Sequence, residues 1–394
     1  MFKSNHRTLQ RIILVMMLGL LVIGSALVVG AQEENVLRVG INAPAELDPA
    51  LGTADAEIIL NRSIYDYLIE IAPDNSLVPN LATDWSVSDD GLTYTFNLVE
   101  NATFHDGSPF TAADVVFTYN RLKELESSAL ALLGDFEVEA VDDFTVQFTL
   151  SDVNPDFLFG VASRFAAILK DGTESPNVLV EGDNPYVNFN GTGPFVLQDY
   201  RPGEQAVLVR NENYWREGEP LLDELQFIYI DDPLAQIDAI RSGTVDVIFR
   251  IPLDQVDALA ESEGVNLTEK PSNIFPAIHI RSDEGHLGED VRIRQAFKLA
   301  TDKVAINELL LNGRGIIGNN DPVGPLYGEF YNDRGDANQV TADPEAACAL
   351  IAETGQERVS ATLYAVDAFN YADLATVLQQ QWEEGCIDVE VLVR

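Results

Sequence analysis

The chain has 394 residues, 46% of them hydrophobic, so it is long enough to bury a sizeable core and to form more than one lobe. It carries 64 acidic against 24 basic residues, and this formal net charge of −40 argues against nucleic acid or an anionic membrane surface as a partner. An acidic surface with few lysines stays hydrated when salt screens its self-repulsion, so we expect a saline habitat.

The N-terminus has the pattern of an export signal. Basic residues precede an apolar run over residues 12–29, and small residues follow up to Ala31. We therefore predict a signal peptide over residues 1–31, cleaved before Gln32, and an extracytoplasmic, periplasmic or cell-surface protein. The alternative is an uncleaved anchor, because the apolar run approaches the roughly 20 residues that span a bilayer. No cysteine lies near Ala31, which excludes a lipoprotein anchor.

The first half of the chain reads as strands with two helices. A strand begins at Val36, a loop follows over residues 45–57, and an apolar periodicity predicts a helix over 58–70. Alternating apolar and polar residues over 92–104 and 144–151 predict half-buried antiparallel strands, with a helix between them. A hairpin is predicted over residues 195–211, with Pro202 and Gly203 at its turn.

The second half alternates strands and helices, which is typical of an α/β lobe with a covered parallel sheet. The first such run comprises residues 225–230, 234–243, 245–251, 253–262 and 265–269. Two helices follow, with Asp290 and Asp302 as N-caps and Gly313 as the end. The last run comprises a helix over 344–353, a strand over 359–366, a helix over 371–384 and a strand over 387–393.

The stretch ATFHDGSPFTAADVVFTYNRL, residues 102–122, crowds polar side chains together and invites a catalytic interpretation. Asp106 and Gly107 form a turn signal, however, and Thr111 with Asp114 has the spacing of a capping box. His105 and Asp106 are consecutive, so on an extended strand their side chains point to opposite faces. We interpret the stretch as the structural junction between a strand and a helix.

The remaining motifs give no catalytic residue, metal site or cofactor site. The four histidines lack metal-ligand spacing, residues 191–194 lack the lysine of a phosphate loop, and no GxSxG occurs. We therefore expect a protein that is not an enzyme. For Cys348 and Cys386, a disulfide in an exported protein and two buried free thiols both remain open.

Four long motifs resemble those of the family 5 solute-binding proteins of ABC transporters. They are LATDWSVSDDGLTYTFNLVENATFHDGSPFTAADVVFTYNRL, NGTGPFVLQDYRPGEQAVLVRNENYW, AIRSGTVDVI and EDVRIRQAFKLATDK, and they occur in the family's order. The resemblance implies an α/β, type II periplasmic-binding-protein fold with two lobes joined by a hinge. It assigns residues 36–70 and 190–278 to lobe I, residues 71–189 to a β-rich subdomain inserted in lobe I, and residues 279–394 to lobe II.

The resemblance also implies which segments contact the ligand: the loop after the first strand, a hinge-proximal segment and a loop of lobe II. The implied ligand-binding residues are Gly52, Thr53, Ala54, Asp55, Ala56, Thr192, Gly193, Asp367, Phe369 and Asn370. Trp85 and Trp215 lie inside the motifs and are interpreted as packing residues.

The function implied by the resemblance is that of a monomeric receptor of an ABC importer. It would capture a peptide-like or other small solute in the cleft between its lobes and deliver it to the permease. Nickel chelates and oligosaccharides stay open as ligands, although the scarcity of histidine disfavours nickel. The alternative class is a secreted hydrolase built on the same fold.

One departure from the family concerns the C-terminal end. Family members continue past the strand equivalent to residues 387–393, so the resemblance implies an incomplete lobe II. We expect such a lobe to expose apolar surface, to aggregate or to bind ligand poorly.

Overall fold

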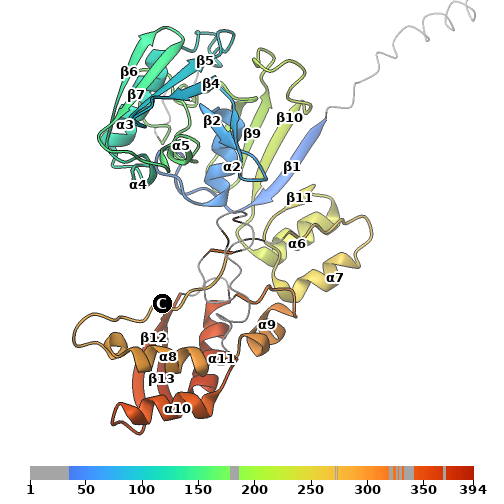
Figure 1. Cartoon of the computed structure of the whole chain (residues 1–394). Helices are drawn as coiled ribbons and strands as arrows, with labels where there is room; N and C mark the ends of the chain where they lie inside the picture. Colours follow the sequence, from blue (N-terminus) through green and yellow to red (C-terminus); the bar gives the residue numbers. More distant parts are fainter. Residues whose placement is uncertain are drawn as a thin grey trace, which may run out of the picture. The chain divides into compact units, whose positions relative to one another are not determined.

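The computed structural model describes residues 35–177, 186–270, 272, 274–318, 323–324, 327, 331, 341–366 and 370–394. The chain divides into two compact units, one up to Phe249 and one from Arg250 to Arg394 (Figure 1). The predicted lobe boundary lies at residue 279, and the assignment of residues 250–278 to lobe I stays a prediction. The predicted signal peptide lies outside the described residues. Within the described ranges, no helix is long and apolar enough to cross a membrane.

Unit 1, the part up to Phe249, contains a five-stranded mixed sheet. Its order is β11 (Val247–Ile248), β1 (Val36–Ile41), β10 (Glu224–Tyr229), β9 (Gln205–Arg210) and β8 (Phe195–Arg201). Strand β1 runs parallel to β10 and β11, whereas β9 is antiparallel to both of its neighbours. Helix α2 (Asp55–Ile64) contacts β8, and helix α6 (Pro233–Ser242) contacts β1 and β11. The predicted hairpin is confirmed, because β8 and β9 pair around a turn in which Gly203 has φ of 73°.

A second sheet in unit 1 is fully antiparallel. Its order is β4 (Ala82–Val87), β5 (Thr93–Leu98), β7 (Thr145–Leu150) and β6 (Phe136–Asp142), which confirms the two predicted strands β5 and β7 (Figure 1). Alternate residues of these strands are buried, as the alternating sequence requires. Their apolar face packs with helices α3 (Ala112–Glu124), α4 (Leu130–Leu133) and α5 (Phe157–Val161) in one core. A small hairpin, β2 (Ile69–Ile71) and β3 (Leu77–Pro79), adjoins β4.

Unit 2, from Arg250 on, is built around two parallel strands, β12 (Val359–Ala365) and β13 (Ile387–Val393). Helix α11 (Tyr371–Glu384) connects them, and α8 (Val291–Leu299), α9 (Lys303–Leu311) and α10 (Pro344–Glu353) complete the helical layer (Figure 1). Short helices cover Leu253–Gln255, Val256–Ala260 and Leu287–Glu289. The core centres on Trp382, which is 2% exposed and stacks edge to face on Phe297.

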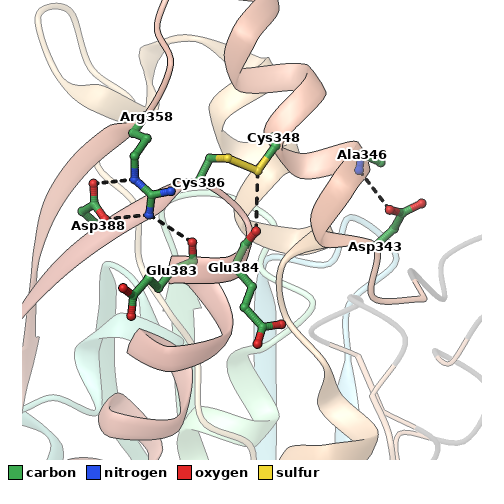
Figure 2. The surroundings of a disulfide bond; sticks show 8 residues. All are labelled: Asp343, Ala346, Cys348, Arg358, Glu383, Glu384, Cys386 and Asp388. Carbon is green, nitrogen blue, oxygen red and sulfur yellow. Dashed lines mark hydrogen bonds and ion pairs between the residues drawn. A yellow bond between two sulfur atoms is a disulfide. The ribbon is translucent and has the colours of Figure 1, made fainter.

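Cys348 and Cys386 form a disulfide, which decides between the two alternatives that the sequence left open (Figure 2). The bond joins α10 to the turn between α11 and β13. Beside it, Arg358 forms an ion pair with Asp388, with an Nη2 to Oδ1 distance of 2.7 Å, and donates a hydrogen bond to the Glu383 carbonyl. Side-chain contacts and a covalent bond therefore fasten the same end of the β12–β13 sheet.

Two sequence predictions need correction. The predicted helix over residues 58–70 is α2, which begins at Asp55 and ends at Ile64, because Tyr65 turns to an extended conformation with φ of −119° and ψ of 150°. The strand predicted over residues 265–269 is irregular, and β11 retains two residues. Helix α9 ends at Leu311 with a left-handed C-cap, Asn312 (φ 50°), and the predicted Gly313 follows as the terminating glycine with φ of 72°. The N-caps Asp290 and Asp302 are confirmed.

Candidate ligand-binding segments of unit 1

The stretch with the suspected catalytic residues, 102–122, is structural. Asp114 accepts hydrogen bonds from the backbone N–H and the hydroxyl of Thr111 at 2.8 and 3.2 Å, which confirms the predicted capping box at the start of α3. The side chains of His105 and Asp106 have different hydrogen-bond partners. The His105 Nε2 lies 3.1 Å from the Gly193 carbonyl oxygen, and Asp106 pairs with Lys170 at 2.6 Å. Burial lowers the pKa of His105, so the ring is neutral.

The loop after β1 is closed by the carboxylate of Glu57, in the first turn of α2. The Oε1 atom accepts the backbone N–H groups of Ala45 and Glu46 at 3.2 and 3.0 Å. The Oε2 atom accepts those of Thr53 and Ala54 at 2.6 and 2.8 Å. Glu57 is 4% exposed, so its charge is compensated by main-chain donors from both ends of the loop.

A second buried carboxylate, Asp48, anchors the middle of the same loop. Its two oxygens face the guanidinium of Arg121 on α3, with an Nη1 to Oδ1 distance of 2.9 Å. Ser175 donates its hydroxyl to Asp48 Oδ2 at 3.0 Å, and the backbone N–H of Ala50 donates to Oδ1 at 3.1 Å. The loop therefore has a fixed path between β1 and α2.

The segment of residues 191–193 lies directly against the last residue of α2. The Gly193 N–H donates to the Ile64 carbonyl at 3.0 Å. A Cβ atom placed on Gly191 or Gly193 would come within 2.0 or 2.6 Å of the same carbonyl oxygen. Both positions therefore require glycine for a backbone-to-backbone approach, which explains this glycine-rich motif without a phosphate ligand.

Asp66, two residues beyond α2, holds the side chains around this segment. Its Oδ2 accepts hydrogen bonds from Thr192 Oγ1 at 3.1 Å and Trp215 Nε1 at 2.9 Å, and its Oδ1 accepts one from Tyr214 Oη at 3.1 Å. Asp66 is 4% exposed, and burial raises its pKa against the opposing effect of these three hydrogen bonds and of Arg216. Trp85 and Trp215 both pack against the core of the antiparallel sheet, as predicted.

The structure distributes the implied ligand-binding residues unevenly. In unit 1, Thr53 and Ala54 are exposed, Asp55 is half-buried, and the other four positions are buried, namely Gly52, Ala56, Thr192 and Gly193. In unit 2, Asn370 is exposed and left-handed with φ of 62°, whereas Asp367 and Phe369 lie outside the described residues. The two segments of unit 1 are brought to opposite ends of one helix, α2.

Sequence reasoning missed Glu57 and Asp66, the two carboxylates that organise these segments. A signal for each is present, because Asp66 stands between Tyr65 and Tyr67, and Glu57 follows a small-residue loop at the start of an apolar helix. An acidic residue in an apolar setting requires several donors if it is buried.

Two open depressions lie elsewhere on unit 1. One of about 880 Å³ adjoins the turn between β6 and β7, and one of about 610 Å³ adjoins Tyr214 and Trp215. Neither is lined by an implied ligand-binding residue. Across the part of the chain that the structure describes, no group of three or more His, Cys, Asp or Glu side chains is arranged to hold a metal ion.

Comparison with known proteins agrees with this architecture. The dipeptide-binding protein of Escherichia coli is 28% identical over 410 residues, which cover 95% of this chain and 74% of that protein. A periplasmic binding protein of Helicobacter pylori in complex with the peptide STSA superposes with a TM-score of 0.71 at 22% identity, covering 91% of this chain and 73% of that one. Campylobacter jejuni NikZ in complex with Ni(L-His) superposes with a TM-score of 0.74 at 22% identity, covering 92% and 74%.

These similarities confirm the fold and the class of protein predicted from the sequence. The solved structures confirm the α/β, type II periplasmic-binding-protein fold. The relatives are binding proteins, which confirms the prediction of a solute-binding protein that is not an enzyme. The model of the bacterial extracellular solute-binding proteins, family 5, matches residues 76–394. Because this match spans most of the sequence, the chain belongs to the family 5 extracellular solute-binding proteins.

Proposed function

We propose that this protein is the extracytoplasmic receptor of an ABC importer and that it captures a small peptide-like solute for delivery to the permease. The observation that carries the proposal is the similarity to a dipeptide-binding protein over 95% of the chain. The relatives are longer than this chain, so the ligand and the permease contact are part of the proposal.

The candidate segments support a small ligand. Their exposed positions, Thr53 and Ala54, carry small side chains on a loop fixed by Glu57. We propose that residues 52–56, Thr192, Gly193 and the loop of residues 367–370 contact the ligand. A preorganised loop with small exposed side chains leaves room for a small solute and lowers the entropic cost of binding it.

The test is ligand-dependent thermal stabilisation of the exported protein, purified after removal of co-purifying solutes by partial unfolding and refolding. The probes are alanyl-alanine, lysyl-alanine and glutamyl-alanine. A ligand at 100 times its Kd stabilises the folded state by about 2.7 kcal/mol. For units of this size we expect the thermal midpoint to rise by roughly 5–10 °C.

Controls separate the remaining ligand classes. Free alanine controls for an effect of any amino acid, and nickel with histidine and a cello-oligosaccharide represent the other two solutes. Stabilisation by one of these in place of the dipeptides would overturn the peptide-like ligand. Release of alanine from alanyl-alanine over hours, followed by amine chromatography, would instead support the hydrolase alternative.

Export and oligomeric state are tested on the same material. We expect the mature protein to begin at Gln32, to be recovered without detergent, and to be a monomer. N-terminal sequencing and light scattering measure these properties. A protein that begins at Met1 and appears only in detergent extracts would favour the anchor.

A further inference from the structure

Helix α2 carries a buried carboxylate at each end. Glu57 lies in its first turn, Asp66 lies just past its last residue, and each is 4% exposed. Removing an ionised carboxylate from water is unfavourable unless hydrogen bonds replace its hydration. The hydrogen-bond donors to Glu57 and Asp66 therefore show which parts of the chain the two buried carboxylates hold in place.

The partners of both carboxylates belong to the candidate ligand segments. Glu57 accepts the N–H groups of Thr53 and Ala54, and it ties them to Ala45 and Glu46 at the other end of the loop. The approach is close, since a Cβ atom on Gly52 would lie 3.1 Å from the Glu57 Cβ. The main chain of the first segment is thus fixed by a side chain of the helix that it leads into.

At the other end, Asp66 accepts the Thr192 hydroxyl. The neighbouring Gly193 donates its N–H to Ile64, the last residue of α2. The second segment is therefore fixed by the same helix, once through a main-chain bond and once through a carboxylate. Trp215 and Tyr214 donate two further hydrogen bonds to Asp66, so both of its oxygens accept from side chains.

We propose that Glu57 and Asp66 are positioning residues, which set residues 52–56 and 191–193 in their ligand-binding conformation before any ligand arrives. The proposal rests on the proposed function. A loop that is ordered in advance loses little conformational entropy when the ligand binds. The affinity therefore depends on the two carboxylates, although neither touches the ligand. A purely stabilising role would change the unfolding equilibrium and leave the affinity of the folded protein unchanged.

The first experiment needs no variant. Hydrogen exchange of the full chain is followed by mass spectrometry without ligand and with alanyl-alanine, lysyl-alanine or glutamyl-alanine. Peptides that cover residues 45–56 and 190–194 are expected to be protected already without ligand. Free exchange of these amides without ligand, with protection appearing only when a dipeptide is added, would overturn the proposal.

The second experiment compares Glu57→Gln and Asp66→Asn with matched controls. An amide at position 57 turns one acceptor oxygen into a donor that faces two N–H groups. Glu70→Gln, at a half-buried surface ion pair with Arg62, and Asp74→Asn, in an exposed turn, make the same chemical changes elsewhere. We expect at least tenfold faster exchange confined to residues 45–56 in Glu57→Gln and to residues 190–194 in Asp66→Asn. The controls should match the unaltered protein.

Binding of the tightest of the three dipeptides is measured by calorimetry at 25 °C, well below the thermal midpoint of each variant. We expect Kd to rise at least tenfold in both variants and less than twofold in both controls. Unchanged Kd in folded variants, or faster exchange spread over all of unit 1, would refute the positioning role. If the unaltered protein binds none of the dipeptides, the proposed function fails, while the exchange pattern still decides whether the carboxylates hold the segments.

Discussion

Removing the disulfide should destabilise unit 2 by a predictable amount. Cys348 and Cys386 are 38 positions apart, and closing a loop of that length in the unfolded chain corresponds to about 4 kcal/mol in the chain-entropy model. The double variant Cys348→Ser with Cys386→Ser keeps two small side chains at these half-buried positions. Its free energy of unfolding should therefore fall by about 4 kcal/mol, chiefly because its unfolded state is less constrained.

Trp382 provides the assay. It lies in the core of unit 2, where its indole donates to Thr301 Oγ1 at 2.9 Å, and the other two tryptophans, Trp85 and Trp215, lie in unit 1. In a background where those two are phenylalanine, fluorescence in urea follows unit 2 alone. For a slope of about 2 kcal/mol/M, the midpoint should drop by roughly 2 M.

The matched control is Ala349→Ser, which introduces the same side chain at the neighbouring exposed position. Dithiothreitol should lower the midpoint of this control and of the unaltered protein to that of the double variant, and should leave the double variant unchanged. A midpoint difference below roughly 0.5 M would refute the argument, since it would correspond to about 1 kcal/mol at that slope.

Three further predictions concern unit 1 and the charge of the whole chain. His105→Ala should lower the stability of unit 1 by about 1–3 kcal/mol, because it removes a half-buried ring and its contact with the Gly193 carbonyl. It should raise the dipeptide Kd less than Asp66→Asn does, because Thr192 and Gly193 keep their bonds to Asp66 and Ile64. Denaturation and calorimetry on one preparation test this, and a loss of affinity at constant stability would contradict it. The thermal midpoint should rise from low to molar salt, because screening relieves the repulsion within a net charge of −40, and a flat profile in scanning calorimetry would show that the charges are too dispersed to matter. Burial raises the pKa of Asp66, so the carboxyl group binds its proton more tightly in the folded protein than in the unfolded chain. The contribution of Asp66 to the free energy of unfolding therefore declines as the pH rises from about 3.9 through the pKa of the folded state. Urea denaturation at several pH values should therefore show a smaller decline in Asp66→Asn than in the unaltered protein, and equal profiles would contradict the raised pKa.

Local rules predicted the elements whose signals lie within a few residues. The capping box of Thr111 and Asp114 and the bounds of α10 and α11 follow from short-range patterns and agree with the structure. The start of α2 was missed because its apolar periodicity begins at Ile58, whereas the helix is initiated by the side chain of Glu57, which returns to Thr53 and Ala54.

The network around Asp66 was beyond the reach of sequence reasoning for a different reason. Its donors lie 126, 148 and 149 residues further along the chain. No periodicity connects such distant positions, and only the folded chain brings the segment before β8, the segment after β9 and the end of α2 together. The same applies to Asp48 and Arg121, which are 73 residues apart.

The packing around α2 explains why the candidate segments consist of small residues. Gly191 and Gly193 are required by the Ile64 carbonyl, and a Cβ atom on Gly52 would make a tight contact of 3.1 Å with the Glu57 Cβ. Because these contacts need small residues, the segments carry few long side chains. The N–H groups of Thr53, Ala54 and Gly193 are bonded within unit 1, so the small residues serve the packing of the segments against α2. The proposal of a peptide-like ligand therefore rests on the family relationship, and the packing accounts for the fixed conformation of the segments.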